Sequence, residues 1–168
     1  AQGGGLLNRG DIDLIASRVD DNQAVSATSD AFGGGILSFG AGAHLSAVAS
    51  SSISHNAATA LGAGLAQGGG LLNVADAELN ASVVQDNAAS SANGTALGGG
   101  DHNSGAAATT VADESMAIYA NRPDDCSAFA SAACGRFRSP PMAPPLLPPA
   151  PSPPTPDYTA VYTAVTVA

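Results

Sequence analysis

The octapeptide Ala-Gln-Gly-Gly-Gly-Leu-Leu-Asn occupies Ala1–Asn8 and recurs unchanged at Ala66–Asn73, an offset of 65 residues. The same offset places Asp11 on Asp76 and keeps the two stretches aligned well beyond the octapeptide. A fixed internal period is typical of architectures that stack one structural unit on the next. The repeat therefore decides the fold class before any local pattern is considered.

Each 65-residue unit contains two related pieces. Every piece begins with three glycines and ends with a β-branched residue, two spacers and an asparagine. The triplets begin at Gly3, Gly33, Gly68 and Gly98, and the asparagines are Asn22, Asn56, Asn87 and Asn121. We predict that the glycines form turns. We predict that the asparagines stack as a ladder at one corner, because buried amides are unfavourable unless they are paired.

Short β-type patterns fill the pieces, and no long apolar stripe of helical period is present. In the first piece, Ile12 and Leu14 alternate with polar residues, which is typical of a strand with one buried face. We expect Gln23–Phe32 to loop out and Asn22 to adopt a left-handed turn. The pattern predicts an all-β solenoid of about four coils, in which Leu6, Ile36 and Leu71 stack at the strand spacing of roughly 4.8 Å.

Proline divides the chain, since all 11 prolines lie at Pro123 or later and interior strands exclude proline. The predicted organisation is a repeat region at 1–122 with pieces at 3–32, 33–67, 68–97 and 98–122, a cysteine-containing linker at 123–138, a proline-rich disordered segment at 139–157, and a β-prone end at 158–168. That end either docks on an open coil edge or has no structural role. Cys126 and Cys134 fit either a small disulfide loop or two unpaired thiols.

The composition limits the classes of partner. The formal net charge is −9 and lysine is absent, whereas nucleic acids and anionic membranes attract basic patches, so we expect no nucleic-acid partner. No run of eighteen apolar residues is present, so we expect no direct membrane insertion. The sequence opens inside its repeated motif, which favours neighbouring repeats of a longer chain as partners.

The paired motifs resemble a known family. Gly3-Gly4-Gly5-Leu6 with Val19-x-x-Asn22 is similar to the repeats of bacterial polymorphic outer-membrane proteins, as are the equivalent motifs from Gly33 and Gly68. More broadly, they resemble glycine-rich right-handed parallel β-helices of the pectin-lyase-like kind. The resemblance implies a right-handed parallel β-helix, an extracellular or cell-surface location, and an adhesive or structural role. The fourth piece departs from the pattern, because Asp101 replaces the aliphatic residue.

Candidate chemistry is sparse. Arg9-Gly10-Asp11 is an integrin-binding tripeptide at a predicted turn, or a solvated turn only. Acids recur at equivalent places two coils apart: Asp11 with Asp76, Asp13 with Glu78, and Asp21 with Asp86. They fit either a catalytic carboxylate pair or the outcome of repetition alone. We expect Ala41, Ala43 and His55 at the equivalent positions of the coil between them.

The three histidines, His44, His55 and His102, have no partners at metal-binding spacing in the sequence. We therefore predict no catalytic, cofactor-binding or metal-binding residue, and no cofactor.

These observations favour a non-enzymatic surface or secreted module, a piece of a longer array, with a structural or adhesive role and with carbohydrate or a cell-surface molecule as a candidate ligand. The alternative is a polysaccharide lyase or glycoside hydrolase on the same fold. Turnover of polyuronides, seen as new unsaturated or reducing ends, would identify such an enzyme.

Overall fold

The chain forms a parallel β-solenoid. The computed structural model describes residues 1–105, 108–113 and 115–128, and these contain strands and turns but no helix. The first three coils each pass through the same five sheets, and within the described residues each strand pairs in parallel with the equivalent strand one coil away. About three turns separate β1 (Leu6–Asn8) from its fourth-coil equivalent β16 (Asp101–Asn103). The all-β solenoid predicted from the repeat is confirmed.

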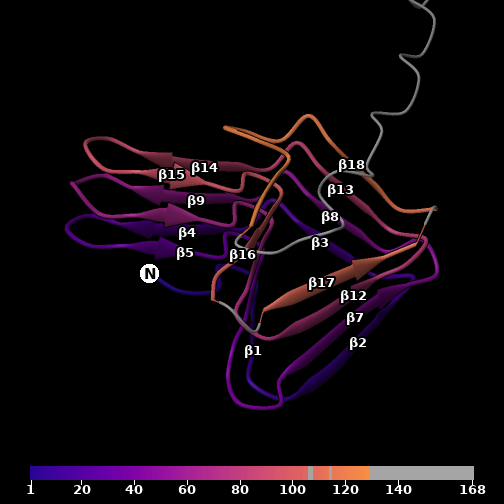
Figure 1. Ribbon diagram of the computed structural model, residues 1–168. Coiled ribbons are helices and arrows are strands. Elements are labelled where there is room, and N and C mark those ends of the chain that lie inside the picture. Colours follow the sequence, from indigo (N-terminus) through magenta and orange to yellow (C-terminus); the bar gives the residue numbers. More distant parts are fainter. Residues whose placement is uncertain (106–107, 114, 129–168) are drawn as a thin grey trace, which may run out of the picture.

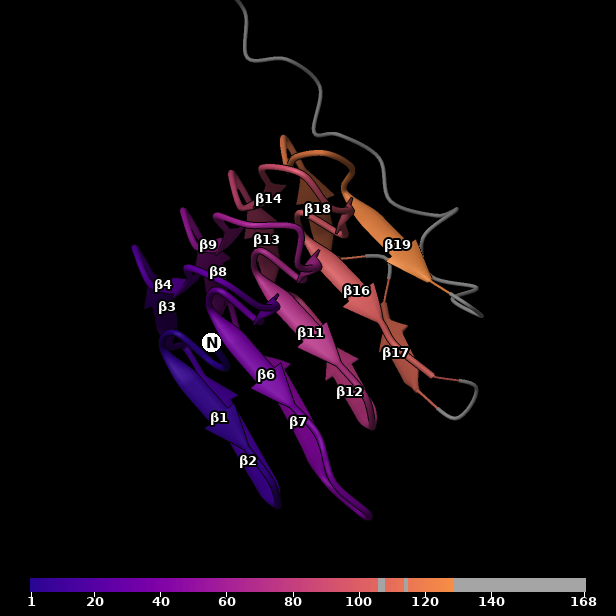
Figure 2. The ribbon, with the colours of Figure 1, turned by 90° about the vertical axis from the view of Figure 1, so that its left-hand side faces the viewer.

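The first sheet joins every coil. Its strands are β1, β6 (Ile36–Ser38), β11 (Leu71–Asn73), β16 and β19 (Cys126–Ala128). Figure 2 shows them side by side in this order. Ile36 lies opposite both Leu6 and Leu71, as the predicted stacking requires. The fifth strand, β19, comes from the segment expected to be a linker, so the sheet continues beyond residue 122.

Two further sheets complete a three-sided body (Figure 1). One contains β2 (Asp11–Ile15), β7 (His44–Val48), β12 (Asp76–Leu79) and β17 (Thr109–Ala112). The other contains β3 (Arg18–Asp20), β8 (Ser52–Ser54), β13 (Val83–Gln85) and β18 (Ala117–Tyr119). The inward residues of all three sheets form the main core, whose largest fully buried apolar members are Ile36, Leu45, Ile53, Leu71, Leu79, Val84 and Ile118.

The remaining strands project from the body as a narrow finger (Figure 1). They are β4 (Gln23–Ser26), β9 (Ala57–Ala60) and β14 (Ala88–Ser91) in one sheet, and β5 (Ala31–Phe32), β10 (Ala66–Gln67) and β15 (Ala96–Leu97) in the other. Gln23–Phe32 therefore does project, but the prediction of a loop was wrong. Stacked projections satisfy each other's backbone groups, as in the bond from Ala57 N to Asn22 O (2.9 Å).

The finger has a separate core made of alanine. Ala31, Ala58, Ala60 and Ala66 are buried there, with Ala89 beside them. Side chains this small allow two sheets to pack face to face in a thin projection. The finger thus uses alanine as its core residue and adds a second core to each of the first three coils.

Each glycine of a triplet has a different role. The first, as at Gly68, adopts a left-handed backbone with φ +63°, and Gly3, Gly33 and Gly98 have φ of +58°, +59° and +60°. A Cβ on the second, Gly69, would overlap the backbone of Ala88 and of the next coil's Gly99. A Cβ on the third, Gly70, would lie 2.9 Å from Asn87 Cγ. The triplet therefore makes the turn, admits the neighbouring coil and leaves room for the asparagine.

The other turn differs from the prediction. The left-handed residues are those before the asparagines, namely Asp21 (φ 57°), His55 (φ 55°), Asp86 (φ 54°) and Ala120 (φ 58°), and Asn22 itself is not left-handed. The asparagine side chain instead reaches along the solenoid to its neighbours, so the turn falls on the preceding residue.

Some sequence predictions concern residues that the structure does not describe. The proline-rich segment 139–157, the β-prone end 158–168 and Cys134 lie outside the described residues. Cys126 starts β19 and is disulfide-bonded. In the described ranges, we find no helix with the length and hydropathy needed to span a bilayer.

Candidate functional site

The most ordered polar feature is the asparagine column at the corner after β3, β8, β13 and β18. The Oδ1 atom of Asn56 accepts from the backbone N and the Nδ2 of Asn22, both at 3.0 Å. Its own Nδ2 donates to Asn87 Oδ1 (3.0 Å) and to Val19 O (2.9 Å). The amide thus makes two donor and two acceptor bonds, which is its full capacity.

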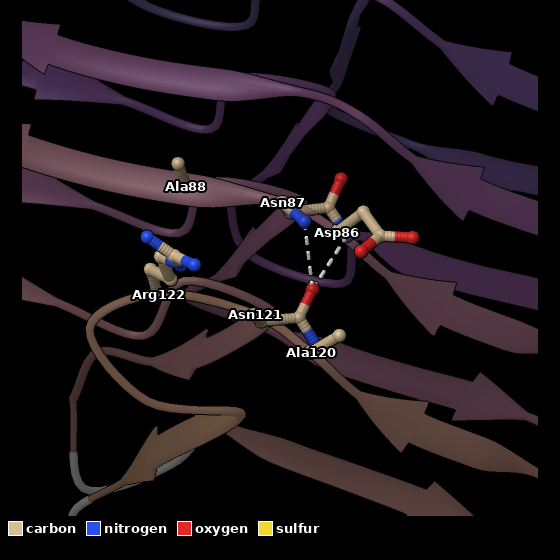
Figure 3. A pocket seen from close by; sticks show the side chains of 6 residues that line it. All are labelled: Asp86, Asn87, Ala88, Ala120, Asn121 and Arg122. Atoms are coloured by element: carbon tan, nitrogen blue, oxygen red, sulfur yellow. Dashed lines mark hydrogen bonds between the residues drawn. The ribbon is translucent and has the colours of Figure 1, made fainter. Parts of the chain in front are cut away.

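The same pattern continues toward the upper end of the column, in the third and fourth coils. Asn87 Nδ2 donates to Asn121 Oδ1 (3.0 Å) and to Ile53 O (2.9 Å), and the backbone N of Asn87 also donates to Asn121 Oδ1 (2.9 Å). Figure 3 shows the oxygen of Asn121 receiving both bonds. Asn56, Asn87 and Asn121 are buried, so the column holds successive coils together where water does not compete.

The two ends of the column differ. At the upper end, Asp125 Oδ1 accepts from the backbone N (2.9 Å) and the Nδ2 (3.1 Å) of Asn121, in the place of a further asparagine. A carboxylate has no proton to donate onward, so the column stops there. At the lower end, no described residue donates to Asn22 Oδ1. The ladder therefore has a closed end and an open end.

A second polar corner follows the first sheet and was missed by sequence reasoning. Asn73 Nδ2 donates to Asn103 Oδ1, Ala75 O and Thr109 O, each at 2.9 Å. Between the first and second coils, Asn8 Nδ2 donates to Ser38 Oγ (3.1 Å). The signal was available, since Asn8 and Asn73 close the repeated octapeptide and Asn103 stands 30 residues further on.

Titratable groups gather just outside the asparagine corner. His55 Nδ1 lies 2.9 Å from Asp20 Oδ1, and His55 Nε2 lies 3.9 Å from Asp86 Oδ2. Asp20 Oδ1 also accepts from Ser54 Oγ (3.0 Å). One ligand atom from each of Asp20, Asp21 and His55 lies within 4.8 Å of the other two. The imidazole of His55, in the second coil, is therefore set among three carboxylates: Asp20 and Asp21 from the first coil and Asp86 from the third.

These groups alter each other's protonation. The hydrogen bond to Asp20 raises the pKa of His55, burial opposes this rise, and the negative charges of Asp20, Asp86 and Asp21 add to it. The same bond lowers the pKa of Asp20, against a smaller effect of burial and with further lowering by Ser54. Both side chains remain accessible, with His55 51% and Asp20 30% exposed.

Two depressions border this corner. One, of about 490 Å³, runs over the β3–β8–β13 face and is lined by Arg18, His55, Gln85 and the hydroxyls of neighbouring serines. The other, of about 310 Å³, lies at the upper end of the asparagine column and is lined by Asp86, Ala88, Arg122 and their neighbours (Figure 3). Both are open to solvent and mixed in lining, and their hydroxyl, amide and guanidinium groups could contact a hydrophilic ligand.

The other sequence candidates are dispersed. The Arg9 guanidinium lies 4.6 Å from the centre of the Phe39 ring, so Arg9 is packed against the next coil. Asp11 and Asp76 do lie two coils apart, but the residue between them is His44; Ser46 lies between Asp13 and Glu78. The expectation of Ala41 and Ala43 there was wrong, because the extra residues of the second coil enlarge the turn before β7. His55 does occupy the coil between Asp21 and Asp86.

The fourth coil carries a buried polar pair. Asp101 and His102 take the places of Leu71 and Leu72 and are both buried. Burial raises the pKa of Asp101 to about 7, although the Thr110 hydroxyl nearby opposes the shift. Burial lowers the pKa of His102, whose Nδ1 lies 2.7 Å from Ser127 Oγ. Asp101 Oδ1 has no hydrogen-bond partner among the described residues.

No protein-family model, no curated protein and no solved structure matches this chain. The parallel solenoid is established by the strand pairings alone.

Proposed function

We propose that the chain is a non-enzymatic structural or adhesive module, extracellular or on a cell surface, that continues at its lower end into neighbouring coils of a longer array. The observation that carries the proposal is the difference between the ends of the ladder. The upper end is closed by Asp125, whereas Asn22 Oδ1 offers an acceptor to a further coil.

The apolar core supports the same proposal. Leu6, Ile12, Leu14 and Val19 of the first coil are only partly buried, whereas their second-coil equivalents, such as Ile36 and Leu45, are completely buried. Burial of one such side chain contributes about 1.5–3 kcal/mol. A further coil stacked on β1, β2 and β3 would bury these residues and pair their free strand edges, which are otherwise sites of unwanted association.

The relationship of the chain to a particular family of β-helix repeats is also a proposal. A glycine triplet followed by an aliphatic residue, together with an asparagine three positions after a β-branched residue, supports kinship with polymorphic outer-membrane protein repeats and pectin-lyase-like β-helices. The structure adds a physical role for each motif, since the third glycine makes room for the asparagine that joins the coils. Carbohydrate or another polar surface molecule is the proposed ligand, because the depression beside β3 and β8 is lined by hydroxyls and Arg18.

The array proposal is tested by adding a coil. Residues 68–95, placed before Ala1, bring a glycine triplet 30 residues ahead of Gly3, which is the spacing between Gly68 and Gly98. We expect the free energy of unfolding to rise by about 1 kcal/mol or more, because four partly exposed apolar side chains become fully buried. Chemical denaturation of the native and extended chains measures the change.

The matched control is the same extension in which the copy of Asn87 is replaced by alanine. It should recover only part of the gain, because no amide then donates to Asn22 Oδ1. An extension that leaves the unfolding free energy unchanged, or a control as stable as the full extension, contradicts the proposed continuation.

A further inference from the structure

We propose that Asp20, Asp21 and His55 form a binding site for one divalent transition-metal ion of the zinc class. The site lies at the corner where β3 and β8 end and joins the first coil to the second. It is argued from this corner alone and does not depend on the proposed function.

The distances favour coordination. Zinc binds imidazole nitrogen and carboxylate oxygen at about 2.0–2.2 Å, so two ligand atoms at tetrahedral positions are about 3.4 Å apart. His55 Nδ1 and Asp20 Oδ1 are 2.9 Å apart, and all three ligand atoms lie within 4.8 Å of each other. Movements of the ligand atoms by about 1.5 Å or less would bring all three to tetrahedral spacing, and exposed side chains can move that far.

The backbone holds these ligands in place. Asp21 and His55 occupy equivalent positions in consecutive coils and have nearly identical φ angles of 57° and 55°. The hydrogen bonds from Asn22 to Asn56 fix the spacing of the two coils directly beside them. Ser54 donates to Asp20 (3.0 Å), so the carboxylate also has an orienting partner of the kind that metal ligands commonly have.

Charge and ligand type favour a transition metal. Three carboxylates surround the imidazole, while the nearest cation, Arg18, lies 4.0 Å from Asp20 and is highly exposed. Imidazole suits zinc, copper and nickel, whereas calcium takes six to eight oxygen ligands. Three protein ligands leave at least one coordination position open to water or to an external donor.

The sequence repeat by itself does not bring the ligand atoms of Asp20, Asp21 and His55 together. His44 also stands in a column between two aspartates, Asp11 and Asp76. Even so, the only group of three or more metal-ligating side chains among the described residues is the one at Asp20, Asp21 and His55. His44 therefore provides a control with the same residue types and without the same convergence.

The test uses the full chain and Zn²⁺ as the probe, with affinity measured by competition against a chromogenic chelator. We expect one ion per chain, weakened at least about tenfold in His55→Asn and in Asp21→Asn, and changed less than about twofold in His44→Asn. Asparagine tolerates the left-handed backbone at both positions, so these variants are expected to fold.

A second measurement is the thermal midpoint with and without Zn²⁺. Binding to the folded state raises the midpoint by mass action, so the native chain and His44→Asn should gain stability while His55→Asn should not. The proposal is overturned if the native chain does not bind Zn²⁺ at millimolar concentration, or if His44→Asn weakens binding as much as His55→Asn. Equal affinities in the native chain and His55→Asn would also overturn it.

Discussion

At the scale of single residues, the asparagine ladder shows why one side-chain type recurs. The amide of Asn56 supplies two donors and two acceptors, and the structure uses all four. Serine could not span two coils in this way, and aspartate could accept but not donate. Asp125 illustrates the second case, because it ends the column that the asparagines extend.

The ladder predicts that Asn87→Ala strongly lowers the free energy of unfolding. This change removes the acceptor for both the backbone N and the Nδ2 of Asn56, and it removes the side-chain donor to Ile53 O and to Asn121 Oδ1, which keeps only its bond from the backbone N of residue 87. Each buried polar group left unpaired costs about 1–3 kcal/mol, so we expect a loss of at least about 3 kcal/mol in unfolding free energy, measured by chemical denaturation.

The control for this change is Asp86→Asn. Asp86 is exposed and left-handed, and asparagine keeps that conformation while alanine would strain it. We expect the control to stay within about 0.5 kcal/mol of the native chain, as surface substitutions usually do. A control as damaging as Asn87→Ala would show that the corner, and not the ladder, determines stability.

At the scale of the elements, β16 differs from the strands beneath it. It presents a carboxyl group to the core where β1, β6 and β11 present leucine or isoleucine. The substitution occurs near the closed end of the ladder, where terminal units of repeat proteins are commonly atypical. Burial raises the pKa of this carboxyl, Asp101, to about 7 from an ordinary value of 3.8.

This strand predicts a defined pH dependence. A raised folded-state pKa means that the unfolded chain ionises first, so stability is lost as pH rises from about 4 to about 7 and is not regained above 7. Asp101→Asn cannot ionise and should escape this loss. We expect its stability advantage over the native chain to be about 3 kcal/mol larger at pH 8 than at pH 4.5. Equal pH profiles for the two chains in denaturation experiments would contradict the assignment.

The elements also show what the sequence could and could not predict. The body strands followed from alternation, as at Ile12 and Leu14, and the coil register followed from the glycine triplets. The finger could not be predicted in the same way, because Gln23–Phe32 is short and polar and has no apolar alternation of its own. Its strands exist because equivalent segments of adjacent coils pair, and this depends on contacts 34 residues away, as from Gln23 to Ala57.

The candidate site was harder to predict for a related reason. Asp20 and His55 are 35 residues apart, and the sequence gives no metal-binding spacing. Their approach requires the stacking of coils and a left-handed turn at His55, whereas the sequence favoured that turn at the asparagine. Asp21 and Asp86 were recognised as equivalent acids, but Asp20 has no acidic equivalent and repetition could not mark it.

At the scale of the whole molecule, the account depends on one arrangement. Coils of about thirty residues lie parallel and in register, so that glycine meets glycine, asparagine meets asparagine and the aliphatic residues stack. The main core, the alanine core of the finger and the ladder are three consequences of that register. The open lower end and the closed upper end give the solenoid a direction.

The most direct test of this arrangement is the set of through-space proton contacts in the NMR spectrum of the full chain. We predict contacts between the backbones of Leu6 and Ile36, and of Ile36 and Leu71, in parallel register. Contacts that instead pair β1 with β2 of its own coil as an antiparallel hairpin, with none between equivalent strands, would contradict the stacked solenoid.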